Sequence, residues 1–211
     1  MLVVITVVAI IAGVVITNFD SVSHDQLLGT AQVVAADIAH ARNLAVTNNS
    51  SYKITFDPAG NRYVLTHSGI NNALDVLPDS AFHAASGATQ HITNLSSLPF
   101  VYSCANLAVV ESSDPMLATI PERVLDLEFG PLGETTRASR TTIWLSAGTR
   151  NERKFMGIAI DPVTGLTSIG TLETTVPESL AMEYFYEDPG TYIPPDYTDP
   201  ATSEPDPAAM P

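Results

Sequence analysis

The amino-acid sequence predicts an α+β fold in which a long N-terminal helix precedes an antiparallel β domain. Three observations predict this fold: an uncharged apolar run over residues 1–17, a helical stripe of apolar residues over 18–48, and short alternating segments over 49–170. Residues 171–211 follow as an acidic tail with nine acidic and no basic residues.

The amino-acid composition excludes several classes of protein and of site. The chain has 211 residues, enough for one domain with extensions, and 45% of them are hydrophobic, which excludes wholesale disorder. It carries 9 Lys and Arg against 23 Asp and Glu, a net charge of −14, so it lacks the overall basic character of a nucleic-acid-binding protein. Its single cysteine, Cys104, excludes an intramolecular disulfide and a cysteine-based zinc site.

The apolar segment at residues 1–17 is interpreted as a membrane anchor. A helix of about 16 residues spans roughly 24 Å, a little less than the ~30 Å hydrocarbon core. A buried core helix and a cleaved signal peptide are the alternatives, but every face is apolar and no positive charge precedes the run. The anchor interpretation assigns lipid contact to Leu2, Val3, Val4, Ile5, Val7, Val8, Ile10, Ile11, Val14, Val15 and Ile16.

The helix is predicted to continue as an amphipathic helix to residue 48, where Asn48 and Asn49 form a stop signal. A signal peptide has no reason to continue in this way. The opposite, polar face is expected to carry Gln26, Thr30, Asp37, His40 and Asn43. The residues expected to pack against the sheet are Leu27, Leu28, Ala31, Val34, Ala35, Ile38 and Leu44.

After the helix, the period of the pattern changes from 3.6 to 2. Residues 52–57 and 62–66 alternate around the turn residues Pro58-Ala-Gly-Asn61, which predicts a β-hairpin. Residues 67–105 are expected to form a long irregular excursion, with a strand candidate at its end over 98–102. Further strands are predicted at 107–111, 124–129, 141–145, 154–160 and 166–169.

The first residues resemble type IV pilins and the pseudopilins of type II secretion. Met1 to Gly13 are similar to the part of that pattern just after its glutamate. The leader glycine, the Phe-Thr-Leu-Ile stretch and the glutamate itself do not occur here. Our hypothesis is that Met1 is an internal methionine and that an upstream in-frame sequence encodes these residues.

The later motifs are similar to the H-type minor pseudopilins of type II secretion, a family that also includes the T-type minor pilins of type IV pili. Residues 37–46 lead into 52–57, and Phe129-Gly-Pro-Leu-Gly133 and 158–165 match a later turn and closing hairpin. The resemblance covers roughly residues 1–170 and implies a pilin-like fold. It implies a structural subunit of a pseudopilus that aids the export of folded proteins across the outer membrane.

The same resemblance implies a single-pass protein of the bacterial inner membrane with its globular domain in the periplasm. Its N-terminal helix would pack with other pseudopilin or pilin subunits. If the full-length start exists, the resemblance implies that prepilin peptidase processes the chain and that its N-terminus is methylated. The alternative is a minor pilin of a type IV pilus or DNA-uptake system.

Motifs for catalysis, metals or cofactors are absent from the sequence. The five histidines, His24, His40, His67, His83 and His91, include no pair three or four residues apart. Ser68, in His67-Ser-Gly, lacks the context of a nucleophile elbow. We therefore expect no enzyme activity, no catalytic or metal site and no cofactor; an exported enzyme released by signal cleavage has no supporting pattern.

Two charged regions remain. Five basic residues flank the predicted strands at 141–145 and 154–160: Arg137, Arg140, Arg150, Arg153 and Lys154. One interpretation is a solvated hairpin on which they pair with nearby acidic residues. The other is that one edge of the hairpin contacts DNA through them. The acidic tail makes nucleic acid the weaker interpretation. Residues 187–211, with seven prolines and six acidic groups, are predicted to be disordered; the alternative is a docking arm that uses Tyr184, Tyr186, Tyr192 and Tyr197.

Overall fold

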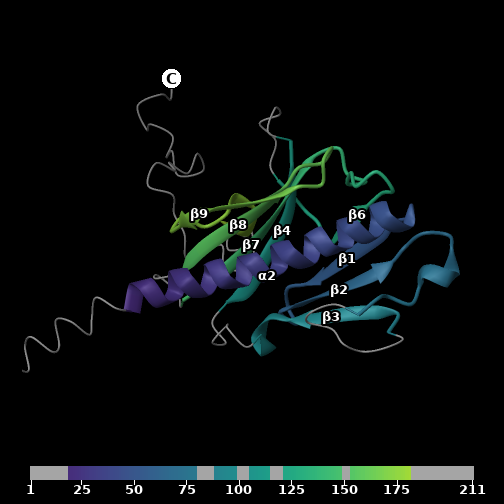
Figure 1. Cartoon of the computed structure of the whole chain (residues 1–211). Coiled ribbons are helices and arrows are strands. Elements are labelled where there is room, and N and C mark those ends of the chain that lie inside the picture. Colours follow the sequence, from purple (N-terminus) through teal and green to yellow (C-terminus); the bar gives the residue numbers. More distant parts are fainter. Residues whose placement is uncertain (1–18, 80–87, 99–104, 115–120, 149–152, 182–211) are drawn as a thin grey trace, which may run out of the picture.

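The computed structural model describes residues 19–79, 88–98, 105–114, 121–148 and 153–181, and in it one helix packs on two antiparallel sheets (Figure 1). The helix is α2, Phe19–Asn48. One sheet has the strand order β3-β2-β1-β6, and the other has the order β5-β4-β7-β8-β9. The predicted α+β class, with an N-terminal helix on antiparallel sheet, is confirmed.

Several predictions fall on residues outside those that the structure describes. They are the membrane anchor at residues 1–17, the tail from 182 onward with its four tyrosines, and His83, Cys104 and Arg150. Within the described ranges, no helix combines the length and the apolar character that crossing a membrane requires.

The first sheet contains β1 (Tyr52–Asp57), β2 (Arg62–His67), β3 (Gln90–Asn94) and β6 (Asp126–Phe129). The β1–β2 hairpin is the predicted one, with Asp57 opposite Arg62 and Tyr52 opposite His67. Its turn is held by the Gly60 N–H, which donates to Asp57 Oδ1 at 2.9 Å. The register places Tyr52 and His67 on one face, at the end of the sheet that lies near the last turn of α2.

The second sheet contains five strands, β5 (Glu122–Arg123), β4 (Asn106–Ser113), β7 (Arg140–Ala147), β8 (Lys154–Ile160) and β9 (Thr167–Glu173). A bulge in β4 lies between Leu107 and Val109. Because an extra residue shifts the alternation, Leu107 and Val110 both join the core, although they lie an odd number of positions apart.

The core lies where α2 meets both sheets. The structure buries Leu27, Ala31, Val34, Ile38, Ala41, Leu44 and Ala45, and packs Leu28 and Ala35 partly against the same core. The expected polar face is partly wrong, because the two sheets cover more of the helix than one stripe. Thr30 is fully buried and satisfies its hydroxyl by donating to the Gln26 carbonyl at 2.8 Å.

The expectation of an irregular excursion over 67–105 is wrong in part. The region contains β3 and two short 3-10 helices, η1 (Asn72–Leu74) and η2 (Leu95–Ser97). The sequence pattern did not predict strand β3. In this strand the polar His91 and Thr93 face inward and the apolar Ile92 is 46% exposed, which is the reverse of the usual alternation. In the candidate strand over 98–102, Leu98 is not in a strand and the rest lies outside the described residues.

Candidate functional site

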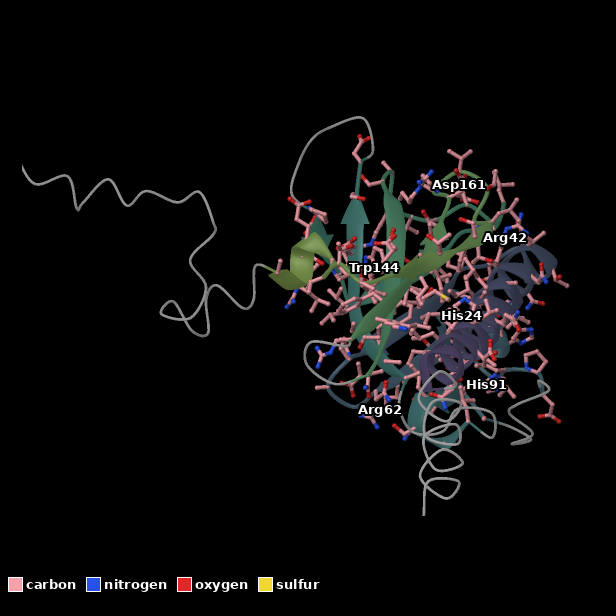
Figure 2. The ribbon with its side chains drawn as sticks, turned by 90° about the vertical axis from the view of Figure 1, so that its left-hand side faces the viewer. His24, Arg42, Arg62, His91, Trp144 and Asp161 are labelled. Carbon is pink, nitrogen blue, oxygen red and sulfur yellow. The ribbon has the colours of Figure 1, made fainter. Side chains whose placement is uncertain are left out.

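The C-terminal end of α2 meets two turns of the sheets, and this junction brings together three of the stretches that resemble pilins. Arg42 Nε donates to the Thr164 carbonyl at 2.7 Å. A Cβ on Gly165 would lie 2.1 Å from the Gly133 carbonyl oxygen, so the two turns touch backbone to backbone. Gly165 and Gly133 both have positive φ, 64° and 84°, which glycine adopts without strain. Arg42 and Asp161, at the start of the 161–165 turn, lie at one end of the molecule and Arg62 at the other (Figure 2).

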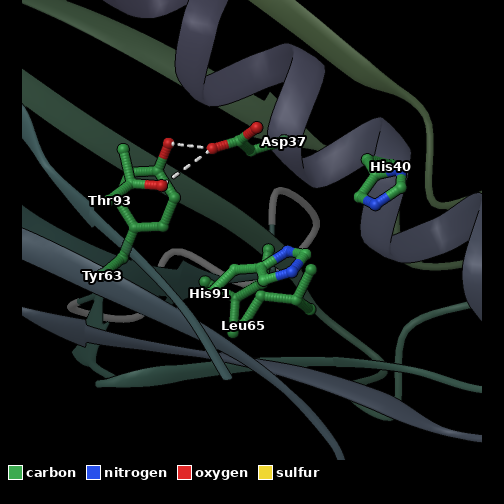
Figure 3. A pocket seen from close by; sticks show the side chains of 7 residues that line it. Asp37, His40, Tyr63, Leu65, His91 and Thr93 are labelled. Carbon is green, nitrogen blue, oxygen red and sulfur yellow. Dashed lines mark hydrogen bonds between the residues drawn. The ribbon is translucent and has the colours of Figure 1, made fainter. Parts of the chain in front are cut away.

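A polar cluster lies under the middle of α2, where the helix crosses the first sheet (Figure 3). Asp37 Oδ2 accepts hydrogen bonds from the Tyr63 hydroxyl at 2.7 Å and from the Thr93 hydroxyl at 3.0 Å. Burial raises the pKa of Tyr63 well above its ordinary value, and the nearby charge of Asp37 raises that pKa further.

The same cluster surrounds a cavity of about 10 Å³ that Asp37, His40, Tyr63, His91 and Thr93 line with Ile54 and Leu65. That volume suits one water molecule and no larger ligand. His40 Nε2 is buried and has no hydrogen-bond partner within the described part of the chain. Among those residues there is also no group of three or more His, Cys, Asp or Glu that suits a metal ion. The hydrogen bonds that Asp37 accepts from Tyr63 and Thr93 therefore connect the helix to the first sheet.

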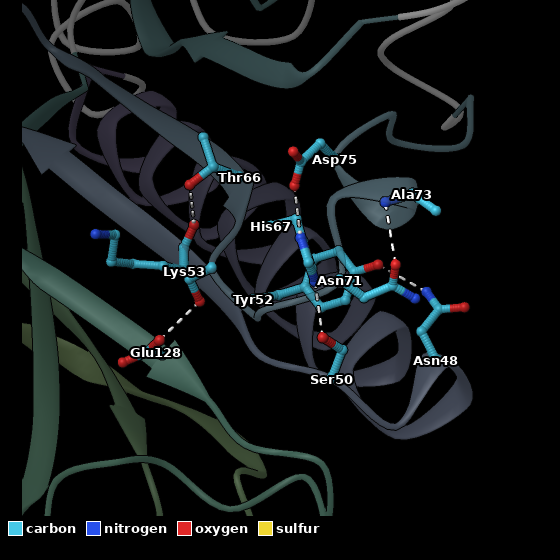
Figure 4. A network of polar contacts seen from close by, with 11 residues as sticks. Asn48, Ser50, Tyr52, Lys53, Thr66, His67, Asn71, Ala73, Asp75 and Glu128 are labelled. Carbon is cyan, nitrogen blue, oxygen red and sulfur yellow. Dashed lines mark hydrogen bonds and ion pairs between the residues drawn. The ribbon is translucent and has the colours of Figure 1, made fainter.

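A second polar network lies just beyond the end of α2 (Figure 4). Asn49 adopts a left-handed conformation, with φ of 47°, and its N–H donates to the Val46 carbonyl at 3.3 Å. The Ser50 N–H donates to the Ala45 carbonyl at 3.1 Å, which completes a Schellman motif. The predicted stop at Asn48 and Asn49 thus ends the helix, and the motif fixes the backbone of Ser50.

From that position, Ser50 Oγ lies 2.7 Å from His67 Nε2, and His67 Nδ1 lies 2.8 Å from Asp75 Oδ1. The Tyr52 ring meets the His67 ring edge to face at 5.1 Å, and Asn48 donates to the Tyr52 hydroxyl at 2.7 Å. Burial raises the pKa of Tyr52; the Asn48 hydrogen bond opposes this, and the charge of Asp75 adds to it.

The described basic residues of the predicted hairpin do not all lie together. Arg140 begins β7 and Lys154 begins β8, and the antiparallel register puts Lys154 opposite Ala147 at the far end of β7. Seven residues at about 3.3 Å each separate the two ends by roughly 23 Å. Arg137 forms an ion pair with Asp126, and Arg153 adjoins Lys154. Among the described residues, Arg140 and Lys154 therefore lie at opposite ends of the hairpin.

The network of Ser50, His67 and Asp75 is the site that sequence reasoning missed. These residues are 17 and 8 positions apart and come from a helix end, a strand end and a 3-10 turn. The sequence showed His67 only beside Ser68, whose hydroxyl instead donates to Glu128 at 2.7 Å. No local spacing in the sequence predicts this arrangement. The one partial signal is η1, which has Asn71 as its N-cap and the acidic Asp75 as its C-cap.

Comparison with known proteins gives a limited result. No family model and no curated protein sequence matches the chain. Two crystal structures of the type IV minor pilin FimU from Pseudomonas aeruginosa (strain PAO1) are similar, each at 15% sequence identity. One has a TM-score of 0.42 and covers 74% of this chain and 96% of its own; the other has 0.40, 73% and 99%. At these values neither structure shows the family of this chain.

Proposed function

We propose that the chain is a structural subunit of a pilin-type filament and has a minor pseudopilin's role in type II secretion. The observation that carries the proposal is the junction at the end of α2. The stretches 37–46, 129–133 and 158–165 are far apart in the sequence, and they meet there through Arg42, Thr164 and the two glycines.

The junction gives these stretches a mechanical reason to occur together. Arg42 ties the helix to the β8–β9 turn, while Val46 Cγ2 lies 3.0 Å from the Cβ position of Gly133. A pull on the helix is then transmitted to both sheets, since β1, β6, β7, β8 and β9 all contact α2. Such coupling is what a subunit needs when its helix is held in a filament and its β domain lies outside.

The apolar residues 1–17 precede α2 in the sequence, and the proposal places them in the membrane. In the membrane, lipid would solvate this segment; in a filament, the helices of neighbouring subunits would replace the lipid. The proposed location is therefore the bacterial inner membrane, with the β domain on the periplasmic side.

The separation of Arg140 from Lys154 favours a structural role over DNA contact. Several basic side chains must act together to bind a phosphate backbone. Here Arg140 and Lys154 lie at opposite ends of one hairpin. The remaining choice is between a secretion pseudopilus and a type IV pilus, and the partner subunits decide it.

Site-specific photo-crosslinking in a bacterium that carries both machines tests the proposal. A crosslinker at Val8 is expected to capture other filament subunits, and mass spectrometry of the products identifies the machine. The matched control is Lys53, on the outer face of the first sheet, where few or no such products are expected. Release of the full chain from membranes by alkaline carbonate, with no Val8 product, would contradict the proposal.

A further inference from the structure

Ser50, His67 and Asp75 form a linear hydrogen-bonded series in which each atom is the one that nucleophilic catalysis requires (Figure 4). In the tautomer whose Nδ1–H donates to Asp75, the lone pair of His67 Nε2 faces the Ser50 hydroxyl. This is the arrangement of a serine nucleophile, a general base and an orienting carboxylate. We propose that Ser50, His67 and Asp75 are a catalytic triad that hydrolyses uncharged carboxylic esters.

The three side chains are held from independent elements. The Schellman motif fixes Ser50, and the end of β2 presents His67, whose side chain is only 1% exposed. Asp75 is the C-cap of η1, and the N-terminal side of that turn is fixed by Asn71, which accepts from the Ala73 N–H at 3.1 Å. The imidazole is thus clamped between its two partners before any substrate arrives, as preorganised catalysis requires.

Gly69 lies directly against the Ser50–His67 pair, at a position where only a residue without a side chain fits. A Cβ on Gly69 would lie 2.1 Å from Ser50 Oγ and 2.8 Å from His67 Nε2, so any side chain there would push the nucleophile from its base. The same point lies 3.2 Å from the backbone nitrogen of Ser51. The Ser51 N–H is the donor that we assign to the oxygen of the reacting carbonyl.

The surroundings select the substrate class. Ile70, which follows Gly69 in the chain, is fully exposed, and Val76, which follows Asp75, is 54% exposed. We assign contact with an apolar acyl chain to these two side chains. The carboxylates of Asp75 and Glu128 place negative charge near the serines at 50 and 68 and disfavour anionic acyl groups. A neutral ester with a short aliphatic acyl chain fits these features.

In the first step, Ser50 Oγ forms a bond to the ester carbonyl carbon while its proton moves to His67 Nε2. The tetrahedral intermediate collapses, the bond to the alcohol oxygen breaks, and His67 returns the proton to the departing alkoxide. Water then attacks the acyl-serine through the same base and releases the carboxylic acid and free Ser50. Asp75 keeps its charge throughout and stabilises the imidazolium.

The test uses the full chain in non-ionic detergent, with a fluorophosphonate probe and with p-nitrophenyl butyrate as the ester. The probe is expected to modify Ser50, which peptide mass spectrometry locates, and the ester to give a burst of p-nitrophenolate. Ser50→Ala should lose both signals. Asp75→Asn should slow both by at least about 100-fold, since loss of the orienting carboxylate costs about 10⁴-fold in serine hydrolases.

Two further variants separate chemistry from folding. Gly69→Ala should abolish labelling through its clash with Ser50 Oγ, while Ser68→Ala, which removes the neighbouring hydroxyl, should label like the original chain. Circular dichroism confirms that each variant is folded; Asp75 is half-exposed, so its substitution leaves the core intact. The proposal is overturned if the original chain shows no label at Ser50, or if folded Asp75→Asn reacts at the original rate.

Discussion

The helix meets its two sheets in different ways. Toward the first sheet it directs Asp37 and His40, which lie among Tyr63, His91 and Thr93 (Figure 3). The core positions of the central strands in the second sheet are aliphatic or Met: Leu107, Val110, Ile143, Leu145, Ala147, Met156, Ile158 and Ile160.

This difference separates two sources of stability. Aliphatic packing is non-directional, and its loss costs both transfer free energy and a cavity. Hydrogen bonds under a helix are directional and give a smaller net gain, but they fix the position of the helix because an unsatisfied buried group is costly. Both sheets supply apolar side chains to the core, and the first sheet adds the hydrogen bonds of Asp37. The free energy of unfolding should therefore depend most on the aliphatic packing, and the register of α2 on those hydrogen bonds.

The largest effect is expected from a cavity in the second sheet. Leu145 is fully buried in β7, so Leu145→Ala should lower the free energy of unfolding by roughly 2–5 kcal/mol. Denaturant unfolding followed by the fluorescence of Trp144, the single tryptophan, measures it. Val163→Ala, at a side chain that is 77% exposed, is the control and should change the free energy by less than about 0.5 kcal/mol. A loss below about 1 kcal/mol for Leu145→Ala would remove the distinction between the sheets.

A smaller effect is expected from the polar contact with the first sheet. Tyr63→Phe removes one of the two hydroxyls that donate to Asp37 and should cost about 1–3 kcal/mol. Thr93→Val removes the other with nearly the same shape. Because both donors share one carboxylate oxygen, the two losses should not add in a double-mutant cycle. Strict additivity would show that the hydroxyls act separately.

The loss of stability at alkaline pH should arise from a residue of the first sheet. The folded-state pKa of Tyr63 is raised, so its contribution to stability is complete below about pH 10 and is lost as the pH rises beyond that value. Tyr63→Phe should flatten the fall of melting temperature between about pH 9 and 11, and Leu145→Ala should leave its slope unchanged. Equal slopes in all three proteins would contradict the assignment.

The sequence predicts one kind of contact far better than the other. The aliphatic stripe of α2 and the alternation of β7 and β8 follow from periodicity, because hydrophobic burial depends on residue type and spacing. Thr30, Asp37, His40, His91 and Thr93 break that rule: each is polar and faces inward or lines the buried cavity. Their burial depends on partners distant in sequence, such as Tyr63 for Asp37, and no local window contains that information.

The same limit applies to the proposed sites. The junction stretches could be found one by one because glycine and proline turns have local signals, but their meeting through Arg42 and Thr164 could not. Ser50, His67 and Asp75 carry no such signal at all. Their geometry arises from the Schellman motif and from the pairing of Tyr52 with His67, which only the folded chain provides.

The smallest expected effect compares one turn from each sheet. In the first sheet, the Gly60 N–H and then Arg62 lower the pKa of Asp57; in the second, the Thr164 N–H and hydroxyl lower the pKa of Asp161. A lowered folded-state pKa means that each contribution is complete above about pH 4 and is lost as the pH falls through the folded-state value. Asp57→Asn and Asp161→Asn keep an acceptor oxygen and remove the titration, so each should slightly reduce the fall of melting temperature between about pH 5 and 2.5. Both turns are solvent-exposed, so the two reductions should be similar; a large effect from one alone would show that the sheets also differ in how their turns hold them together.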